Sequence, residues 1–386
     1  MLDSPIRVSR HHGTLDALAP EWARLADEQH PGAAFRTPAW LAAWWRHATP
    51  NGAREPHVLL AHAGGELCGI LPLYAAPGAL GERRLRLMGD GIVGSDYQGA
   101  IARPEHAAVV ARAFAAHLAR AGAALDLDDL DDGDPLLAAC DDWLGDRADR
   151  VERYLCPHVR IGADFDDYLR RLPDGTGAQW HRRRKWLERF DDYRIDELRA
   201  PDDVERGLGV LFELHRQRWA LEGGSDAIDG PRVETFHRAA GRALAELGWA
   251  RVYVMHADGA PRAALYGFRH GDRFVFYQAG HEPAWRPRSV GTVLLGSVIR
   301  QCFTERIGEF DFLRGSEPYK LKWANGARHT VSLRARGLGL RARISSEGRA
   351  IAGELRAFAK RVLPESALEW VRARRRRLAR VEGGAA

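Results

Sequence analysis

Apolar and polar positions alternate along residues 273–279, which read Arg-Phe-Val-Phe-Tyr-Gln-Ala. A period of two with aromatic and β-branched side chains is typical of a half-buried strand. From Val293 to Thr304 the apolar residues instead recur at the spacing of an amphipathic helix. Between these two segments, residues 286–292 read Arg-Pro-Arg-Ser-Val-Gly-Thr. We therefore predict a strand, a basic glycine-containing turn and a long helix, in that order.

The predicted turn has the features of an anion site. The first N–H groups of a helix have no internal acceptor, Gly291 allows close approach of a ligand, and Arg286 and Arg288 add positive charge. These features suit a pyrophosphate. They also fit an ordinary helix start with surface arginines, because short glycine motifs match often by chance, and both interpretations stay open.

A strand-and-hairpin pattern occurs twice along the chain. Residues 57–65 and 251–259 each predict a strand that enters a tight glycine-containing turn. Residues 67–74 and 262–268 predict the strands that return from these turns. The pattern indicates an internal duplication, although two unrelated hairpins would share it as well.

The segments after the two hairpins also correspond. Helices predicted at 107–121 and 293–307 each run into a glycine and a further strand, so we predict two copies of one α/β unit in tandem. The predicted domains are residues 1–163 and 164–340, followed by a helical arginine-rich tail at 341–386.

The two copies differ ahead of their helices. Residues 102–107 read Ala-Arg-Pro-Glu-His-Ala, with an acid and no glycine, so this turn is poorly suited to an anion. We expect the first half to be a scaffold and part of a cleft. Its loop at 89–98 carries Asp96 and Tyr97, which are candidate substrate contacts, although Asp96 fits a turn cap equally well.

The segment between the two halves is rich in cations and tryptophan. A helical pattern at 165–190 is interrupted at 173–177 and contains Trp-His-Arg-Arg-Arg-Lys-Trp at 180–186. Such a run can bind a phosphorylated or nucleic-acid partner, but it is more often a solvated helix face, which we favour. A further helix at 204–219 leads into a glycine-containing loop at 220–230 that is flexible enough to act as a lid.

Composition limits the class of protein. A chain of 386 residues with 45% hydrophobic residues suggests two globular domains. It has no apolar run long enough for a membrane span and begins without a signal-peptide pattern, so we expect a soluble cytoplasmic protein. The cysteines are far apart without metal-ligand spacing, so we expect buried thiols and no metal: Cys68, Cys140, Cys156 and Cys302.

The positive charge is concentrated near the C-terminus. The formal net charge is +5, and residues 371–380 carry six arginines and no acid, so the rest of the chain is nearly neutral. A nucleic-acid partner is therefore not expected. The tail fits either a basic helix that contacts an anionic membrane surface or a solubilising end.

Four motifs resemble the GNAT-like acyltransferases of the CelD/BioF2 type, which are associated with bacterial cellulose and exopolysaccharide loci. They are Phe-Arg-Thr-Pro-Ala-Trp at 35–40, Gly-Ser-Asp-Tyr at 94–97, Ser-Val-Gly at 289–291, and Asp-Phe-Leu-Arg-Gly-Ser-Glu-Pro-Tyr-Lys-Leu-Lys-Trp at 311–323. The resemblance covers roughly residues 5–335. It implies distant kinship with Fem-type tandem enzymes, which move amino acids from aminoacyl-tRNA onto peptidoglycan precursors.

The resemblance implies an α/β fold of two tandem GNAT domains, each a mixed twisted sheet flanked by helices. The second would hold acetyl-CoA or another acyl-CoA as co-substrate, with the thioester beside the strand at 277–279. Val293 occupies the second small position of the GNAT signature, which leaves the identity of acetyl-CoA open. The implied cofactor-binding residues are Gln278, Arg286, Arg288, Ser289, Val290, Gly291 and Thr292.

Acyl transfer from a thioester to an amine needs a base, a donor to the oxyanion and a proton source. A backbone N–H near Gln278 is the candidate oxyanion donor. Asp311 is expected to face the cleft, or equally to bond a neighbouring loop or Arg314. The candidate catalytic residues are Tyr277, His281, Glu282, Asp311 and Glu317.

The acceptor site is expected near the end of the last motif. Lys320 and Lys322 lie on a segment predicted to be extended, where they would face the same side beside Tyr319 and hold an anionic or sugar-phosphate acceptor. The candidate acceptor-binding residues are Asp96, Tyr97, Arg314, Tyr319, Lys320 and Lys322.

Three functions remain open from sequence. The favoured one is an N-acyltransferase that acts on an amino sugar or another envelope precursor. The second is a Fem-like aminoacyltransferase that uses charged tRNA through residues 180–186. The third is a catalytically silent interaction module attached to a membrane or a partner by its tail.

Overall fold

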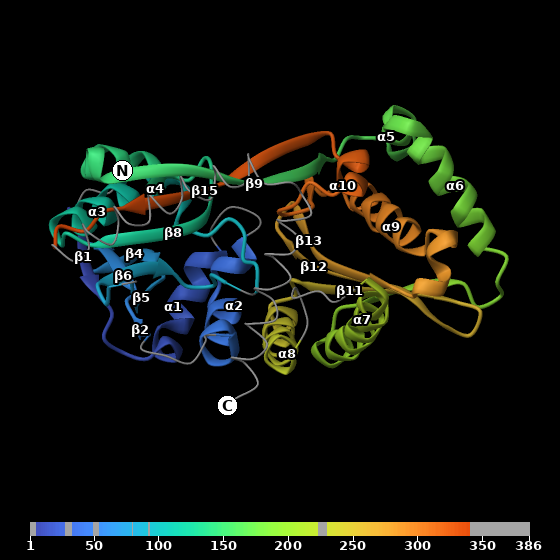
Figure 1. Ribbon diagram of the computed structural model, residues 1–386, viewed down its shortest axis with the longest axis horizontal. Helices are drawn as coiled ribbons and strands as arrows, with labels where there is room; N and C mark the ends of the chain where they lie inside the picture. Colours follow the sequence, from blue (N-terminus) through green and yellow to red (C-terminus); the bar gives the residue numbers. More distant parts are fainter. Residues whose placement is uncertain are drawn as a thin grey trace.

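A computed structural model describes residues 5–27, 33–48, 54–78, 80–91, 93–222 and 230–339. Two α/β halves lie side by side along the long axis of the molecule (Figure 1). Within the described residues they share a sheet of 11 strands in the order β10-β11-β12-β13-β14-β9-β15-β8-β6-β5-β2. A second sheet has the order β1-β3-β4-β7. The arginine-rich tail expected at 341–386 lies outside the described residues.

The first half begins its helices at capped turns. Thr37 accepts a hydrogen bond from the N–H of Trp40, and Asp134 accepts one from Leu136, in each case just before a proline in the first turn. The elements are β1 (Arg7–Arg10), α1 (Leu15–Asp27), η1 (Ala33–Arg36), α2 (Pro38–Ala43), η2 (Trp44–Ala48), β2 (Glu55–Pro56), β3 (Leu59–Ala63), β4 (Glu66–Leu71), β5 (Leu73–Pro77), β6 (Arg83–Leu87), β7 (Ile101–Ala102), η3 (Pro104–His106), α3 (Ala107–Arg120), β8 (Ala124–Asp131), α4 (Pro135–Leu144), η4 (Gly145–Arg147) and β9 (Ala148–Arg160).

The second half starts with two helices on the outer flank of the molecule and continues into the predicted hairpin and long helix (Figure 1). Its elements are α5 (Phe165–Arg171), η5 (Pro173–Gly175), α6 (Thr176–Leu187), β10 (Arg194–Leu198), α7 (Pro201–Glu222), α8 (Pro231–Glu246), β11 (Ala250–Ala257), β12 (Ala260–His270), β13 (Arg273–His281), η6 (Pro283–Arg288), α9 (Val290–Thr304), β14 (Glu309–Asp311), α10 (Pro318–Trp323) and β15 (Gly326–Ala335).

The two halves repeat one topology. Each contains an antiparallel hairpin, β3–β4 in the first half and β11–β12 in the second. In each half a helix then lies, along the chain, between two strands that pair in parallel. In the first half α3 lies between β6 and β8, and in the second half α9 lies between β13 and β14. The predicted tandem duplication and the mixed α/β class are thus confirmed.

The last strand of each half pairs with the other half. β9 runs antiparallel to β14, with Val159 opposite Phe310, and β15 runs antiparallel to β8, with Leu333 opposite Leu127. β9 and β15 also pair with each other. Because these strands are exchanged, the two halves cannot separate without breaking backbone hydrogen bonds of the shared sheet.

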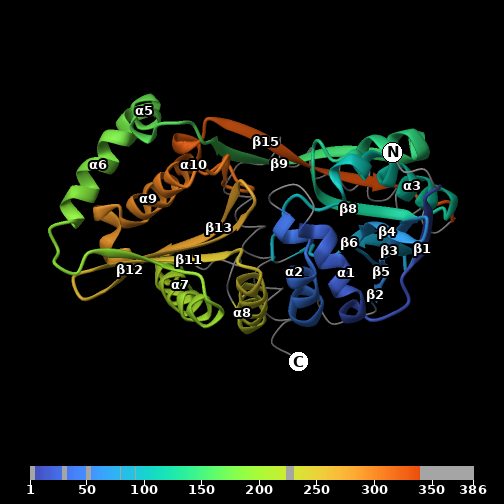
Figure 2. The same ribbon diagram turned by 180° about the vertical axis from the view of Figure 1, so that it is seen from behind.

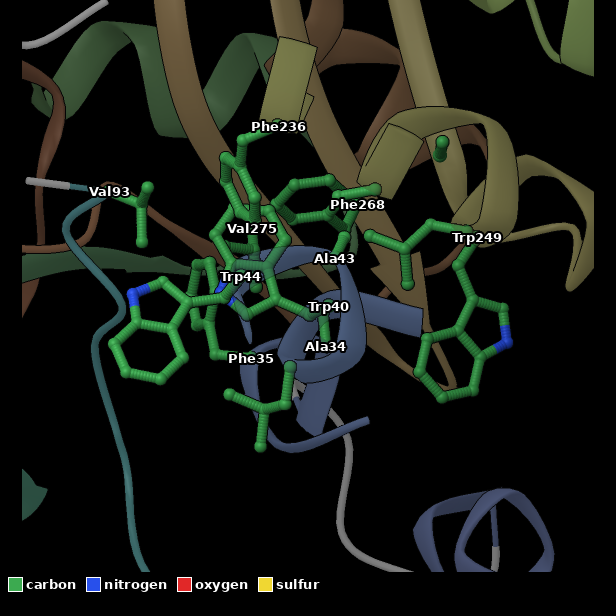
Figure 3. Packing of buried hydrophobic residues seen from close by; sticks show 14 of the residues in the cluster. Ala34, Phe35, Trp40, Ala43, Trp44, Val93, Phe236, Trp249, Phe268 and Val275 are labelled. Atoms are coloured by element: carbon green, nitrogen blue, oxygen red, sulfur yellow. The ribbon is translucent and has the colours of Figure 1, made fainter. Parts of the chain in front are cut away.

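Helices cover both faces of the second half's sheet. α7 and α8 lie on one face of β11–β13 and α9 lies on the other (Figures 1 and 2). The motif at 35–40, which runs from η1 into α2, packs against the second half. The ring centroid of Trp40 lies 4.8 Å from that of Phe236 on α8 and 5.6 Å from that of Phe268 on β12, and Figure 3 shows these rings packed together. Aromatic rings bury large apolar areas, so this cluster stabilises the contact between the halves.

Three element predictions need correction. α9 begins at Val290 instead of Val293, so residues 290–292 belong to its first turn. α7 continues to Glu222, into the loop predicted from residue 220, and residues 223–229 of that loop lie outside the described part. The segment with Lys320 and Lys322 is the helix α10 and not an extended strand.

One expectation from composition also has an outcome. The four cysteines are buried free thiols, as predicted. In the described part of the chain, no helix is long and apolar enough to cross a membrane, and no group of side chains is arranged to hold a metal ion.

Candidate functional site

The parallel strands β13 and β14 pair over the whole of β14 but only over the first three residues of β13. The register joins Arg273 to Glu309 and Val275 to Asp311, where β14 ends. β13 continues to His281 along β12, and a bulge leaves Tyr277 without a partner in the register. A bulge re-aims the strand that carries it, so the second part of β13 is an unpaired edge that faces α9.

A cavity of about 290 Å³ opens along this edge. It joins the end of β13 to the first turn of α9, and α10 contributes one side chain. The lining residues are Phe276, Gln278, Ala279, Gly280, His281, Arg286, Ser289, Val290, Gly291, Thr292, Leu295 and Tyr319. The structure therefore brings together the implied cofactor residues, except Arg288, with the candidates His281 and Tyr319.

The first turn of α9 presents its backbone to the cavity. Ser289 precedes the helix in a left-handed conformation (φ 58°), and its side chain does not cap the helix. The N–H groups of Val290, Gly291 and Thr292 thus open the helix at positions that have no internal acceptor. A Cβ added at Gly291 would lie 3.5 Å from Nδ1 of His281, so this glycine faces the strand across the cavity.

The edge of β13 carries a second backbone donor. The N–H of Ala279 donates to Oε1 of Gln278 at 3.0 Å, so the side chain of Gln278 occupies the donor that sequence assigned to an oxyanion. His281 and Tyr319 supply the titratable groups of the lining, and the side chain of Tyr319 is exposed. The cavity thus combines backbone donors, a basic side chain and two groups that can exchange protons.

A sequence comparison agrees with this geometry. Residues 176–321 match the family model described as an acetyltransferase (GNAT) domain. A GNAT domain is thus matched over most of the second half, from the start of α6 into α10. A comparison with curated protein sequences finds no match.

Solved structures share the whole tandem arrangement. FemX superposes with a TM-score of 0.60 at 11% identity, over 84% of this chain and 96% of FemX. L-PGS from Bacillus licheniformis gives a TM-score of 0.51 at 10% identity, over 88% and 96%. A conserved protein of unknown function from Bacteroides thetaiotaomicron gives 0.53 at 11%, over 85% and 99%. At 10–11% identity, these superpositions show a shared fold that extends over both halves of the chain.

Asp96 and Arg314 do not reach the cavity of the GNAT domain. Oδ2 of Asp96 accepts a hydrogen bond of 2.9 Å from the backbone N–H of Arg314, and Oδ1 accepts one from its Nε. Nη2 of Arg314 also donates to Oδ2 of Asp129 at 2.9 Å. Asp96 is fully buried. Both residues were expected to contact substrate, and the structure places them instead in an ion pair between the two halves.

Asp311 and Tyr97 form a second buried contact between the halves. The Tyr97 hydroxyl donates to Oδ1 of Asp311 at 3.1 Å. Burial raises the pKa of Asp311 to about 6, although the guanidinium of Arg328, whose Nη1 lies 3.7 Å from Oδ2, lowers it. Neither residue lines the cavity, and Asp311 bonds the neighbouring loop at 89–98, which is the second of the two roles expected for it. The sequence reasoning did not single out Arg328, which lies on β15.

Tyr277 points into the domain contact. Its hydroxyl donates to the carbonyl of Val93 and lies 3.4 Å from Nε2 of His237, and burial raises its pKa. Burial also lowers the pKa of His237 to about 3, so this imidazole is neutral. Tyr277 was a catalytic candidate, but the bulge turns it away from the cavity lining.

The remaining candidates separate along α10 and η6. Nζ of Lys320 is buried and donates to the carbonyl of Arg314 at 2.6 Å, while Lys322 pairs with Asp174 at 3.3 Å. The expectation that the two lysines face the same side is wrong, because two residues of a helix that are two apart point about 200° apart. Glu317 pairs with Lys320 at 3.1 Å. The last candidate base, Glu282, pairs with Arg262 at 2.5 Å.

Proposed function

We propose that the chain is an acyltransferase that moves an acyl group from an acyl-CoA thioester to an amine. The observation that supports this is the cavity that joins the edge of β13 to the first turn of α9. To bind a thioester on a long phosphorylated carrier, a site needs a hydrogen-bond donor for the thioester carbonyl and a place that binds the phosphate anion. The cavity offers the two within one space.

We place the acyl-CoA lengthwise in the cavity, with its pyrophosphate at the start of α9 and its thioester at β13. Its pyrophosphate accepts hydrogen bonds from the N–H groups of Val290, Gly291 and Thr292, where the helix dipole favours negative charge, and Arg286 adds a cation. Its thioester carbonyl takes the place of Oε1 of Gln278 at the N–H of Ala279. That N–H then stabilises the oxyanion that forms when the amine attacks.

The proposed reaction uses two side chains of the lining. A neutral amine attacks the thioester carbonyl and a C–N bond forms. His281 takes the proton from the attacking nitrogen. The C–S bond then breaks, and Tyr319 gives its phenolic proton to the departing thiolate. The acyl group thus passes from the thiol to the amine, the amine proton passes to His281, and the thiolate that keeps the C–S electron pair receives its proton from Tyr319.

We propose that the acceptor amine belongs to an amino sugar or another precursor of the cell envelope. The support is the similarity of the motifs at 35–40, 94–97 and 311–323 to the CelD/BioF2 type. Transfer of labelled acetyl groups to amino sugars, compared with simple alkyl amines of similar pKa, tests this proposal. Equal rates with both classes would contradict a sugar acceptor without affecting the proposed donor.

Calorimetric titration of acetyl-CoA into the purified chain tests the donor site, beside Gly291→Glu and Gly291→Gln. An acid is favourable in the first turn of a helix, so we expect the Glu variant to fold while it repels a phosphate. The Gln variant is a control of the same size without charge. We expect binding to weaken at least about tenfold from Gln to Glu. Equal binding by all three proteins would exclude the site, and no binding of acetyl-CoA or longer acyl-CoAs by wild type would exclude the function.

A second candidate function is aminoacyl transfer from charged RNA. Arg182, Arg183 and Lys185 on α6 are exposed, and none of them has an ion-pair partner among the described residues. FemX and L-PGS have the same fold. An RNA-borne donor predicts binding that weakens steeply as salt rises, whereas acyl-CoA binding would change much less.

A further inference from the structure

Three aromatic rings lie beside the cavity, where α6 meets η6. Trp186 is 5.2 Å from Phe190 and 6.1 Å from Trp285 between ring centroids, and Phe190 is 5.6 Å from Trp285. All three are half-buried. Trp285 belongs to η6, which leads directly into Ser289 and the first turn of α9. The rings thus form a partly exposed surface next to the proposed pyrophosphate site.

Two arginines cover these rings, and their surroundings differ. The guanidinium carbon of Arg262 lies 4.3 Å from the centroid of Trp285, but Arg262 is buried and is neutralised by Glu282 at 2.5 Å. The guanidinium carbon of Arg288 lies 4.2 Å from the centroid of Trp186, and Arg288 is exposed. No carboxylate of the described residues pairs with Arg288. One guanidinium therefore lies over an indole ring and has no ion-pair partner among the described carboxylates.

Further cations lie on the same side of α6. Arg182 and Arg183 precede Trp186 by four and three residues, so they are its neighbours on the helix surface. Both are exposed. Ser289, which lines the cavity, follows Arg288 directly in the chain, so the Arg288–Trp186 pair adjoins the cavity at the end of η6.

We propose that Arg288, which lies over the Trp186 ring, binds the phosphorylated adenosine of the acyl donor. This inference rests on the proposed function. A purine stacks well on a guanidinium plane that already lies on an aromatic ring, and Arg182 and Arg183 supply charge for the phosphate of the ribose. CoA and the 3′ end of a charged RNA both carry an adenosine with a ribose-bound phosphate, at the 3′ and 5′ positions in CoA and at the 5′ position in the RNA. The surface would therefore select for the nucleotide part of the donor.

Binding of CoA is compared with that of 4′-phosphopantetheine, which lacks the adenosine nucleotide. Calorimetry on the full chain uses wild type, Arg288→Gln, Arg288→Lys, Trp186→Leu and the control Arg300→Gln, an exposed arginine further along α9. We expect wild type and the control to prefer CoA by at least about tenfold, and the three surface variants to lose most of this preference. Arg288→Lys keeps the positive charge but has no planar group. A loss of CoA preference in this variant therefore identifies stacking as the interaction.

The outcomes separate the two proposals. If wild type prefers CoA and Arg288→Gln keeps that preference, the surface is excluded and the CoA site stands. Equal binding of both ligands by wild type also excludes the surface. If wild type binds neither, acyl-CoA use fails, and a short RNA with an unpaired 3′ adenosine becomes the probe. RNA binding that is lost in Arg288→Gln would support the surface with an RNA-borne donor, and no RNA binding would overturn it.

Discussion

Arg314 in the second half and Asp96 in the first half are joined by two hydrogen bonds, one from the backbone N–H and one from the guanidinium of Arg314. Asp96 is fully buried, and burial raises its pKa while Arg314 lowers it. A buried carboxylate needs such a partner. The pair therefore belongs to the contact that holds the two halves together, although the motifs at 94–97 and 311–323 that carry it were expected to contact a substrate.

We expect Arg314→Met to lower the free energy of unfolding by about 3–5 kcal/mol, because the variant leaves Asp96 buried without its partner. Urea denaturation measures this change. The double variant Arg314→Met/Asp96→Asn should recover part of the loss, since the buried charge is then absent. Loss of donor or acceptor binding with an unchanged unfolding midpoint would instead support the original substrate-binding role.

The effect of Arg328→Met should depend on pH through Asp311. The pKa of Asp311 rises from 3.8 to about 6 in the folded protein, so its contribution to stability is fully present below about pH 4 and is lost as pH rises through 6. Without Arg328 that pKa rises further. The variant should therefore be more destabilised at pH 8 than at pH 5, by about 1.4 kcal/mol for each unit of additional shift.

Urea midpoints of wild type and Arg328→Met at pH 5 and pH 8 measure this difference. In an Asp311→Asn background the group no longer titrates, so the cost of Arg328→Met should be nearly the same at both pH values. A cost that is larger at pH 5 would mean that Asp311 is not the group responsible.

Substitution of the buried Lys320 should cost more stability than substitution of the exposed Lys322. Lys320→Met removes a charged donor to the carbonyl of Arg314 and should destabilise the protein by about 1.5–3 kcal/mol. Lys322→Met removes a surface pair with Asp174 and should change stability by less than about 1 kcal/mol. Thermal unfolding of the two variants compares them directly. Equal stability, together with a raised acceptor KM in Lys320→Met alone, would support an acceptor contact.

Gln278→Leu should free the N–H of Ala279, because the leucine has no acceptor to occupy it. We expect a thioester analogue to bind up to about fivefold tighter to this variant, while free CoA, which has no thioester carbonyl, binds as it does to wild type. Competition titrations with both ligands provide the measurement. Weaker binding of both ligands would mean that the Gln278 side chain itself contacts the carrier.

Local sequence predicted the elements that surround the cavity. The alternation at 273–279 indicated β13, the apolar spacing indicated α9, and the arginines with Gly291 indicated a turn for anions, because these patterns depend on neighbouring residues. These local patterns therefore predict His281 and the turn at 286–292 as parts of the site. The bulge at Tyr277 and the bond from Ala279 to Gln278 were not visible in these patterns, because they depend on the pairing of β13 with β12.

The sequence by itself indicated the tandem α/β repeat and which half holds the basic, glycine-containing helix start, since periodicity and turn chemistry are local properties. Only the tertiary structure decided which polar side chains face a ligand. Asp96, Tyr97, Asp311 and Arg314 were expected at a substrate, but the exchange of β9 and β15 brings the halves together and buries these groups against one another. A buried charge must find its partner wherever packing provides one, and here Tyr97 lies 214 residues from Asp311 and Asp96 lies 218 residues from Arg314.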